Sequence, residues 1–143
     1  MLFRSQQPIV AAIQKAARKT HNSFSAMLAT ASAESSLNPR AKARTSDATG
    51  LFQFTKPTWL SIVKRYGHEA GIYPTQAEKS LLALRVDPSV ASMMAGFLAN
   101  ENRAHLEQCL GRPVSDQEVY VAHFMGAASA ARMLMSAAAM PLR

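Results

Sequence analysis

The sequence has little of what several protein classes require. Its 143 residues include one cysteine, Cys109, so no disulfide can form within the chain. The 6 glycines and 7 prolines are few for a β-sandwich or barrel with its many turns. No run of about 18 apolar residues marks a membrane-spanning helix. Aromatic residues make up only 7% and do not alternate with a basic stripe, so the signature of a single-strand nucleic-acid platform is missing.

What the chain does contain favours helices. Hydrophobic residues make up 48% of it, with many alanines and methionines, which are good helix formers. A chain of this length buries a core without metal or disulfide support. We therefore expect one all-α domain over residues 1–143, or α+β only if a very short strand forms near residues 50–54.

The charge balance points to an acidic partner. The formal net charge is +7 and the isoelectric point is near 10.1, but the 16 Lys and Arg residues are scattered along the chain. Nucleic-acid sites gather basic residues into one patch, so we do not expect nucleic acid as a partner. A polyanionic glycan of the cell wall satisfies the charge equally well.

Apolar periodicity and capping residues predict seven helices. They span about residues 8–18, 24–35, 56–66, 76–84, 88–110, 116–124 and 127–139. The expected N-caps are Ser23 or Asn22, Thr55, Asp87 and Ser115. Residues 40–49 are small, polar and basic, which is typical of a loop, and residues 50–54 are too few for periodicity to assign.

One carboxylate, Glu34, stands where the second helix is expected to end. It falls seven residues after Met27 at the border of an apolar stripe, and Asn38-Pro39 stops the helix soon after. Partial burial disfavours the ionised form of a carboxyl group, which suits a general acid. A glutamate near a helix end is more often a solvated surface residue, so position alone leaves both interpretations open.

A glycosidase usually needs a second carboxylate, and the sequence offers few. Asp87 and Glu118 are better explained as helix caps, which leaves Asp47 and Glu101 as candidates. Each of these is more often a turn or helix-surface residue. Cys109 is expected to be a small buried residue, because no local feature ties it to a histidine as a thiol nucleophile would need.

Three short blocks carry a resemblance to a known family. They are ESSLNP at residues 34–39, ATGLFQF at residues 48–54 and TW at residues 58–59. Together they resemble the catalytic stretch of the soluble lytic transglycosylases, which are lysozyme-like domains that cleave peptidoglycan. The resemblance is strongest over residues 24–60 and weaker over residues 87–135.

The resemblance implies that Glu34 is the sole catalytic acid and base, so that no second carboxylate is needed. Glu34 would protonate the oxygen between N-acetylmuramic acid and N-acetylglucosamine, and then take a proton from the muramoyl C6 hydroxyl to give a 1,6-anhydro sugar. The substrate-binding residues it implies are Ser35, Gly50, Leu51, Phe52 and Gln53, with residues 50–52 acting through their backbone. For Gln53 the alternative is that it only caps local backbone. No metal or cofactor is expected.

The chain departs from the family pattern in its second half. Where the family has Ala-Tyr-Asn-Ala-Gly, residues 122–126 are Ala-His-Phe-Met-Gly, so the tyrosine that orients the catalytic carboxyl is out of register. Either Tyr120 or His123 takes over this role in the site, or the role is vacant. Asp47 also falls near the family's usual glycine, and Ala91 stands where the long helix usually has asparagine.

Two alternatives to transglycosylation stay open at this stage. The same acid supports hydrolysis if Asp47 or Glu101 holds a water, and the altered 122–126 block fits a peptidoglycan-binding or secretion-assembly module without turnover. Peptidoglycan strands are the expected partner throughout, with secretion, flagellar or phage machinery as further candidates, and we expect a monomer. The substrate places the protein in the periplasm or otherwise at the cell wall, although the first residues lack a signal-peptide pattern.

Overall fold

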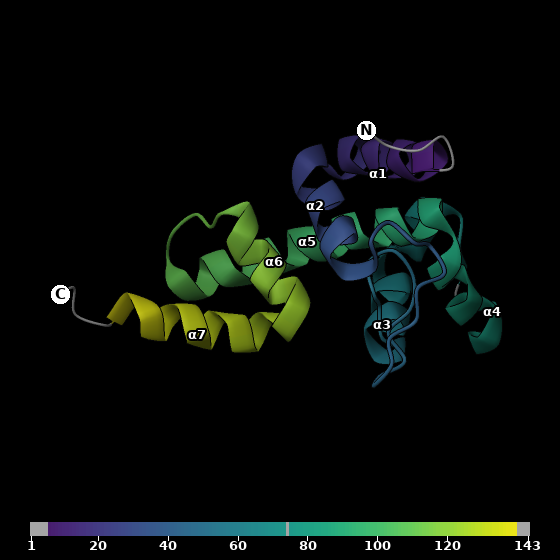
Figure 1. The fold of residues 1–143 in the computed structure, drawn as a ribbon. Coiled ribbons are helices and arrows are strands. Elements are labelled where there is room, and N and C mark those ends of the chain that lie inside the picture. The colour runs from purple at the N-terminus through teal and green to yellow at the C-terminus, as the bar shows by residue number, and fades with distance from the viewer. Residues whose placement is uncertain (1–5, 74, 140–143) are drawn as a thin grey trace. The chain divides into compact units, whose positions relative to one another are not determined.

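The computed structural model describes residues 6–73 and 75–139 of the chain (Figure 1). This part forms the helices α1 (Gln7–Thr20), α2 (Phe24–Ser35), α3 (Lys56–Tyr66), α4 (Glu78–Ala83), α5 (Pro88–Leu110), α6 (Asp116–Met125) and α7 (Ala127–Ala139), with the 3-10 helices η2 (Gly67–Ala70) and η3 (Leu84–Val86). The predicted all-α class is confirmed. Within the described residues, the region near 50–54 holds only isolated β-bridges, which pair Lys42 with Thr49 and Thr49 with Phe54.

Three helices begin at capping residues that the sequence predicts. The Ser23 hydroxyl accepts a hydrogen bond of 3.2 Å from the Ala26 backbone, and Ser115 forms a complete capping box with Glu118. The Asp87 carboxylate accepts from two backbone N–H groups at 2.9 and 3.1 Å. These oxygens satisfy N–H groups that a helix leaves without partners in its first turn.

Two boundaries differ in detail from the sequence prediction. α3 ends at Gly67 as expected, but the chain keeps coiling as η2 because Gly67 has a right-handed φ of −54°. The coil stops at Gly71, whose φ of 73° is left-handed. The helix expected over residues 76–84 has two parts, since α4 begins only at Glu78 and continues as η3.

The described residues fall into two compact units, one ending at Phe97 and the other beginning at Leu98. α5 therefore supplies its first residues to one unit and its last residues to the other. The expectation of a single domain over residues 1–143 stays a prediction.

The core of the first unit includes Trp59 of α3. Its ring is fully buried and packs edge-on against Phe54, with the ring centroids 4.9 Å apart. The indole Nε1 donates a hydrogen bond of 2.7 Å to the Leu81 carbonyl. Other fully buried large side chains of this unit are those of Ile13, Leu51, Phe52, Ile62 and Met94. Because Leu51 and Phe52 belong to this core, the packing holds residues 50–53 in place.

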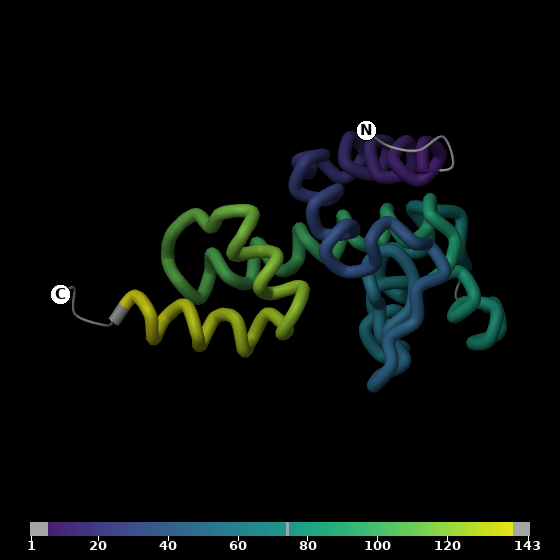
Figure 2. The backbone as a smooth tube through the Cα atoms, in the orientation of Figure 1, coloured from purple at the N-terminus to yellow at the C-terminus, as the bar shows by residue number. Residues whose placement is uncertain are grey.

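The chain between α2 and α3 is a long loop that reverses direction and runs back alongside itself (Figure 2). Thr49 and Phe54 exchange backbone hydrogen bonds of 3.0 and 3.1 Å. Residues 50–53 therefore form a tight turn that is closed at its base. This turn, called the 50–53 turn below, carries the block expected to line the site.

The second unit packs around small side chains. α6 lies against α7 (Figure 1), and the buried residues at the centre are Leu106, Ala122, Ala130 and Ala131. Alanine at three of these four positions lets the helices approach closely.

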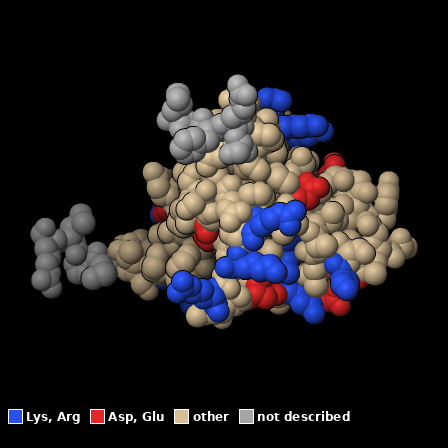
Figure 3. All heavy atoms as spheres, turned by 45° about the vertical axis from the view of Figure 1, so that its right-hand side comes forward, with Lys and Arg blue, Asp and Glu red and all other residues tan. Residues whose placement is uncertain are grey.

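Charged residues are spread over the surface, as the sequence indicates. On the face drawn in Figure 3, Lys and Arg side chains lie in several groups with Asp and Glu among them. Among the described residues, no single helix is long and apolar enough to cross a membrane. Only the bent pair Glu78–Val86 and Pro88–Leu110, which meet at 94°, reaches the required length and composition when taken together.

Candidate functional site

Glu34 lies in the last turn of α2, and its side chain is partly buried. The helix ends one residue later, because Ser36 and Leu37 both take left-handed φ values of 53° and 62°. The Ser36 N–H closes the last turn with a hydrogen bond of 2.9 Å. The predicted helix end after Glu34 is confirmed, although the left-handed pair ends the helix before Asn38-Pro39 is reached.

Ser35 joins the end of α2 to the 50–53 turn. Its single hydroxyl proton is shared between two carbonyl acceptors, that of Leu51 at 2.8 Å and that of Ala31 at 2.9 Å. The contact with Ala31 is common for a serine inside a helix, whereas the contact with Leu51 links two separate sequence blocks. The structure thus brings the Glu34-Ser35 dipeptide together with the block at residues 50–53.

Gly50 occupies a position that only glycine fits. Its φ is 89°, and a Cβ built there would lie 2.1 Å from the Arg85 carbonyl oxygen. A side chain at this position is therefore excluded both by backbone conformation and by a clash. The Gly50 N–H donates to the Ala41 carbonyl at 2.8 Å, which fixes the start of the turn.

Gln53 uses its side-chain amide within its own loop. Nε2 donates to the carbonyls of Gly50, at 2.9 Å, and Ala41, at 3.2 Å. These are the local backbone contacts that the sequence offers as the alternative to a substrate contact. The side chain is partly exposed, and its contact with a glycan stays a prediction.

Leu51 and Phe52 turn their side chains into the core, where each is 1% exposed. Their side chains are therefore closed to a ligand, and these two residues offer only their backbone groups for contact. The expectation that residues 50–52 contact the glycan through their backbone stays a prediction.

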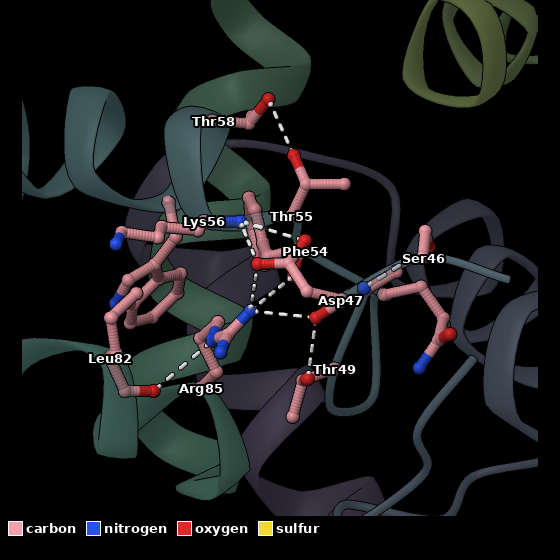
Figure 4. Close-up of polar contacts among 12 residues, drawn as sticks. Ser46, Asp47, Thr49, Phe54, Thr55, Lys56, Thr58, Leu82 and Arg85 are labelled. Atoms are coloured by element: carbon pink, nitrogen blue, oxygen red, sulfur yellow. Dashed lines mark hydrogen bonds and ion pairs between the residues drawn. The ribbon is translucent and has the colours of Figure 1, made fainter. Parts of the chain in front are cut away.

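Arg85, which the sequence does not predict as a site residue, bonds to the backbone on either side of the 50–53 turn (Figure 4). Its Nη1 donates to the carbonyls of Asp47, at 2.9 Å, and Phe54, at 3.1 Å, and its Nε donates to the Leu82 carbonyl at 3.2 Å. The side chain is only 12% exposed. No local pattern could reveal these contacts, since the carbonyls of Asp47 and Phe54 are 38 and 31 residues away in sequence.

Asp47 caps α3 in place of Thr55. Both of its carboxylate oxygens accept from the Lys56 N–H, at 3.1 and 3.3 Å, and one lies 3.6 Å from Arg85 Nη1. Thr55 occupies the N-cap position, but its hydroxyl bonds to that of Thr58 at 3.3 Å. A carboxylate near a helix N-terminus is favoured by the helix dipole, so Asp47 has a structural role that the sequence assigns to Thr55.

Tyr120 and His123 lie one turn apart on α6 in the second unit, and both side chains are partly exposed. Their rings are nearly parallel, at 14°, with centroids 6.4 Å apart. Glu101 lies on α5 in the same unit and is partly buried. The roles considered for these three residues stay predictions.

The expectation for Cys109 is wrong. Cys109 is exposed, and its Sγ lies 3.6 Å from Nε2 of His105. The two residues are four apart on α5, which places them on one helix face, so a local feature does tie the thiol to a histidine. No group of three or more His, Cys, Asp or Glu side chains within the described ranges is arranged to hold a metal ion.

Comparison with known families finds a match. Residues 11–84 fit the model of the transglycosylase SLT domain, which spans just over half of the chain. The matched range includes Glu34, Ser35 and the whole 50–53 turn, and it ends one residue before Arg85. The family recognised from the three sequence blocks is confirmed.

Proposed function

Because the chain belongs to the transglycosylase SLT family, we propose that it cleaves the bond between N-acetylmuramic acid and N-acetylglucosamine by lytic transglycosylation. The family acts on peptidoglycan of the cell wall. The observation that carries the proposal for this chain is the 2.8 Å hydrogen bond from Ser35 to Leu51. It joins the residue next to Glu34 to the turn that the resemblance assigns to the glycan.

Glu34 is the catalytic residue in this proposal. In its protonated form it donates to the glycosidic oxygen while the bond from that oxygen to C1 of the muramoyl sugar breaks. The positive charge that develops at C1 is stabilised by the substrate's own N-acetyl group and by the polar groups of the site. The N-acetylglucosamine end leaves with the proton.

The second step restores the enzyme. The muramoyl C6 hydroxyl oxygen attacks C1, and its proton passes to the Glu34 carboxylate, which closes the 1,6-anhydro ring. No water is consumed, and one carboxyl group serves both steps. In this scheme the 50–53 turn holds the sugar through backbone groups and Gln53.

Hydrolysis would need a second group to activate water. The contacts of Asp47 argue against that role, because its carboxylate is occupied by the Lys56 N–H and by Arg85. We therefore propose transglycosylation ahead of hydrolysis. We further propose a monomeric protein that is exported to the wall, where secretion, flagellar or phage machinery brings it to its substrate.

Digestion of purified sacculi tests the proposed function. Wild-type protein should release muropeptides that mass spectrometry identifies by the anhydro end, whereas Glu34→Gln should release none and still bind. Reducing muramic acid ends would show a hydrolase instead. Binding without release by both proteins would show a module that has lost turnover.

A further inference from the structure

A hollow of about 420 Å³ lies beside the segment that leads into the 50–53 turn. Its walls come from residues 42–49 and from the α4–η3 region. Three cationic side chains line it, those of Lys42, Lys79 and Arg85, together with a single carboxylate, that of Asp47. The proposed reaction does not use this hollow.

The guanidinium of Arg85 is held in place through Nε and Nη1, which leaves Nη2 available to a ligand. Nε donates to the Leu82 carbonyl, and Nη1 donates to the carbonyls of Asp47 and Phe54 and lies near the Asp47 carboxylate. Nη2 donates to no residue within 6–73 and 75–139, although the side chain is only 12% exposed. A guanidinium held in this way loses little freedom when its open N–H groups bind an anion.

The ammonium groups of the two lysines that line the hollow, Lys42 and Lys79, are also available to a ligand. Within the described part of the chain, the ammonium groups of Lys42 and Lys79 have no hydrogen-bond or ion-pair partner. The one carboxylate on the wall is already used by the Lys56 N–H and by Arg85. The hollow thus holds an excess of positive charge with donors free to receive an anion.

We propose that this hollow binds a carboxylate of the peptide stems that branch from peptidoglycan. The inference rests on the proposed function for the identity of the substrate. Stem peptides carry free carboxylates, and the N–H groups of a guanidinium flanked by ammonium groups suit a carboxylate well. The hollow also adjoins the proposed glycan site along the chain, because Lys42 follows Ala41, whose carbonyl accepts from Gly50 and Gln53 at 2.8 and 3.2 Å.

Binding of two glycan preparations to a non-cleaving protein tests this site. Glu34→Gln protein would be titrated with strands that keep their acidic stems and with the same strands stripped of stems by an amidase. Adding Lys42→Gln and Lys79→Gln together should weaken binding of the stemmed strands about tenfold and leave that of the stripped strands unchanged. Lys64→Gln is the matched control, since Lys64 is an exposed lysine of α3 outside the hollow, and it should change neither.

Three results would overturn the inference. Equal weakening on both preparations would mean that the lysines act only through overall charge, and unchanged binding of stemmed strands would mean that no such site exists. As a soluble probe, the tripeptide Ala-γ-Glu-diaminopimelate should compete with stemmed strands, and its fully amidated form should not. Competition by inorganic phosphate but not by the tripeptide would contradict a carboxylate site.

This assay is independent of turnover. If wild-type protein releases no fragments but the lysine variants show the stem-dependent loss, the proposed reaction fails and the stem site stands. If fragments carry anhydro ends and the lysine variants bind like the parent protein, the reaction stands and the stem site fails.

Discussion

The hydroxyl of Ser35 donates to the carbonyl of Leu51 at 2.8 Å, and this contact fixes the turn at residues 50–53 against the end of α2. Glu34 precedes Ser35 in the last turn of that helix. The Ser35 hydroxyl therefore helps to set the spacing between Glu34 and the turn, together with the buried side chains of Leu51 and Phe52.

Ser35→Ala should lower turnover more than it lowers stability. Loss of one partly buried hydrogen bond costs about 1 kcal/mol of unfolding free energy, whereas misplacing an acid lowers kcat by a larger factor. Urea unfolding and the rate of fragment release from sacculi measure the two effects. Ser32→Ala, at an exposed position on the same helix, should change neither. A Ser35→Ala protein with wild-type kcat would contradict the positioning role.

Gly50→Ala should destabilise the protein more than a left-handed backbone alone explains. At Gly50 a Cβ meets the Arg85 carbonyl oxygen at 2.1 Å, whereas at Gly111, which is also left-handed, nothing lies within 4 Å. Gly111→Ala should therefore lower the free energy of unfolding by about 1–2 kcal/mol, from backbone conformation only. Gly50→Ala should lower it by more. Equal losses in urea unfolding would show that the turn shifts freely away from Arg85.

Asp47→Ala should weaken the start of α3, and Thr55→Ala should not. The Asp47 carboxylate accepts the Lys56 N–H, whereas Thr55 makes no capping bond, so the first substitution should cost about 1 kcal/mol. Thermal unfolding of the two variants makes the comparison. Asp47→Asn should also keep releasing anhydro fragments, and its loss of all activity would revive the hydrolase hypothesis.

Glu118 makes the second unit sensitive to acid. A hydrogen bond from Arg112 and the backbone bond at Ser115 lower the pKa of Glu118 from 4.5 to about 2. Because the folded pKa is the lower one, the stabilisation is fully present above about pH 4.5 and is lost as the pH falls toward 2. Unfolding free energies measured across this range should fall more steeply for wild type than for Glu118→Gln. Parallel curves would contradict the assignment.

The features predictable from sequence were those set by neighbours along the chain. Asp87, Ser115 and the end of the helix after Glu34 follow from spacings of a few residues, because caps and helix stops are local. The roles of Asp47 and Arg85 were not predictable, since they depend on where the folded chain returns to the turn. The contact between His105 and Cys109 also follows from sequence, because the two residues stand four apart on a predicted helix.

The hydrogen bonds that Gly50 and Gln53 donate within the loop share two carbonyl acceptors. The Ala41 and Gly50 carbonyls each accept two donors, and three of these four bonds start from Gln53. Because one side chain joins both oxygens, no single bond can break without loosening the others. The loop therefore opens as one cooperative event, and the Gly50 and Gln53 amides should share a single opening free energy in hydrogen exchange. In such an opening event the Gln53 side chain and the 50–53 turn would leave the candidate site together.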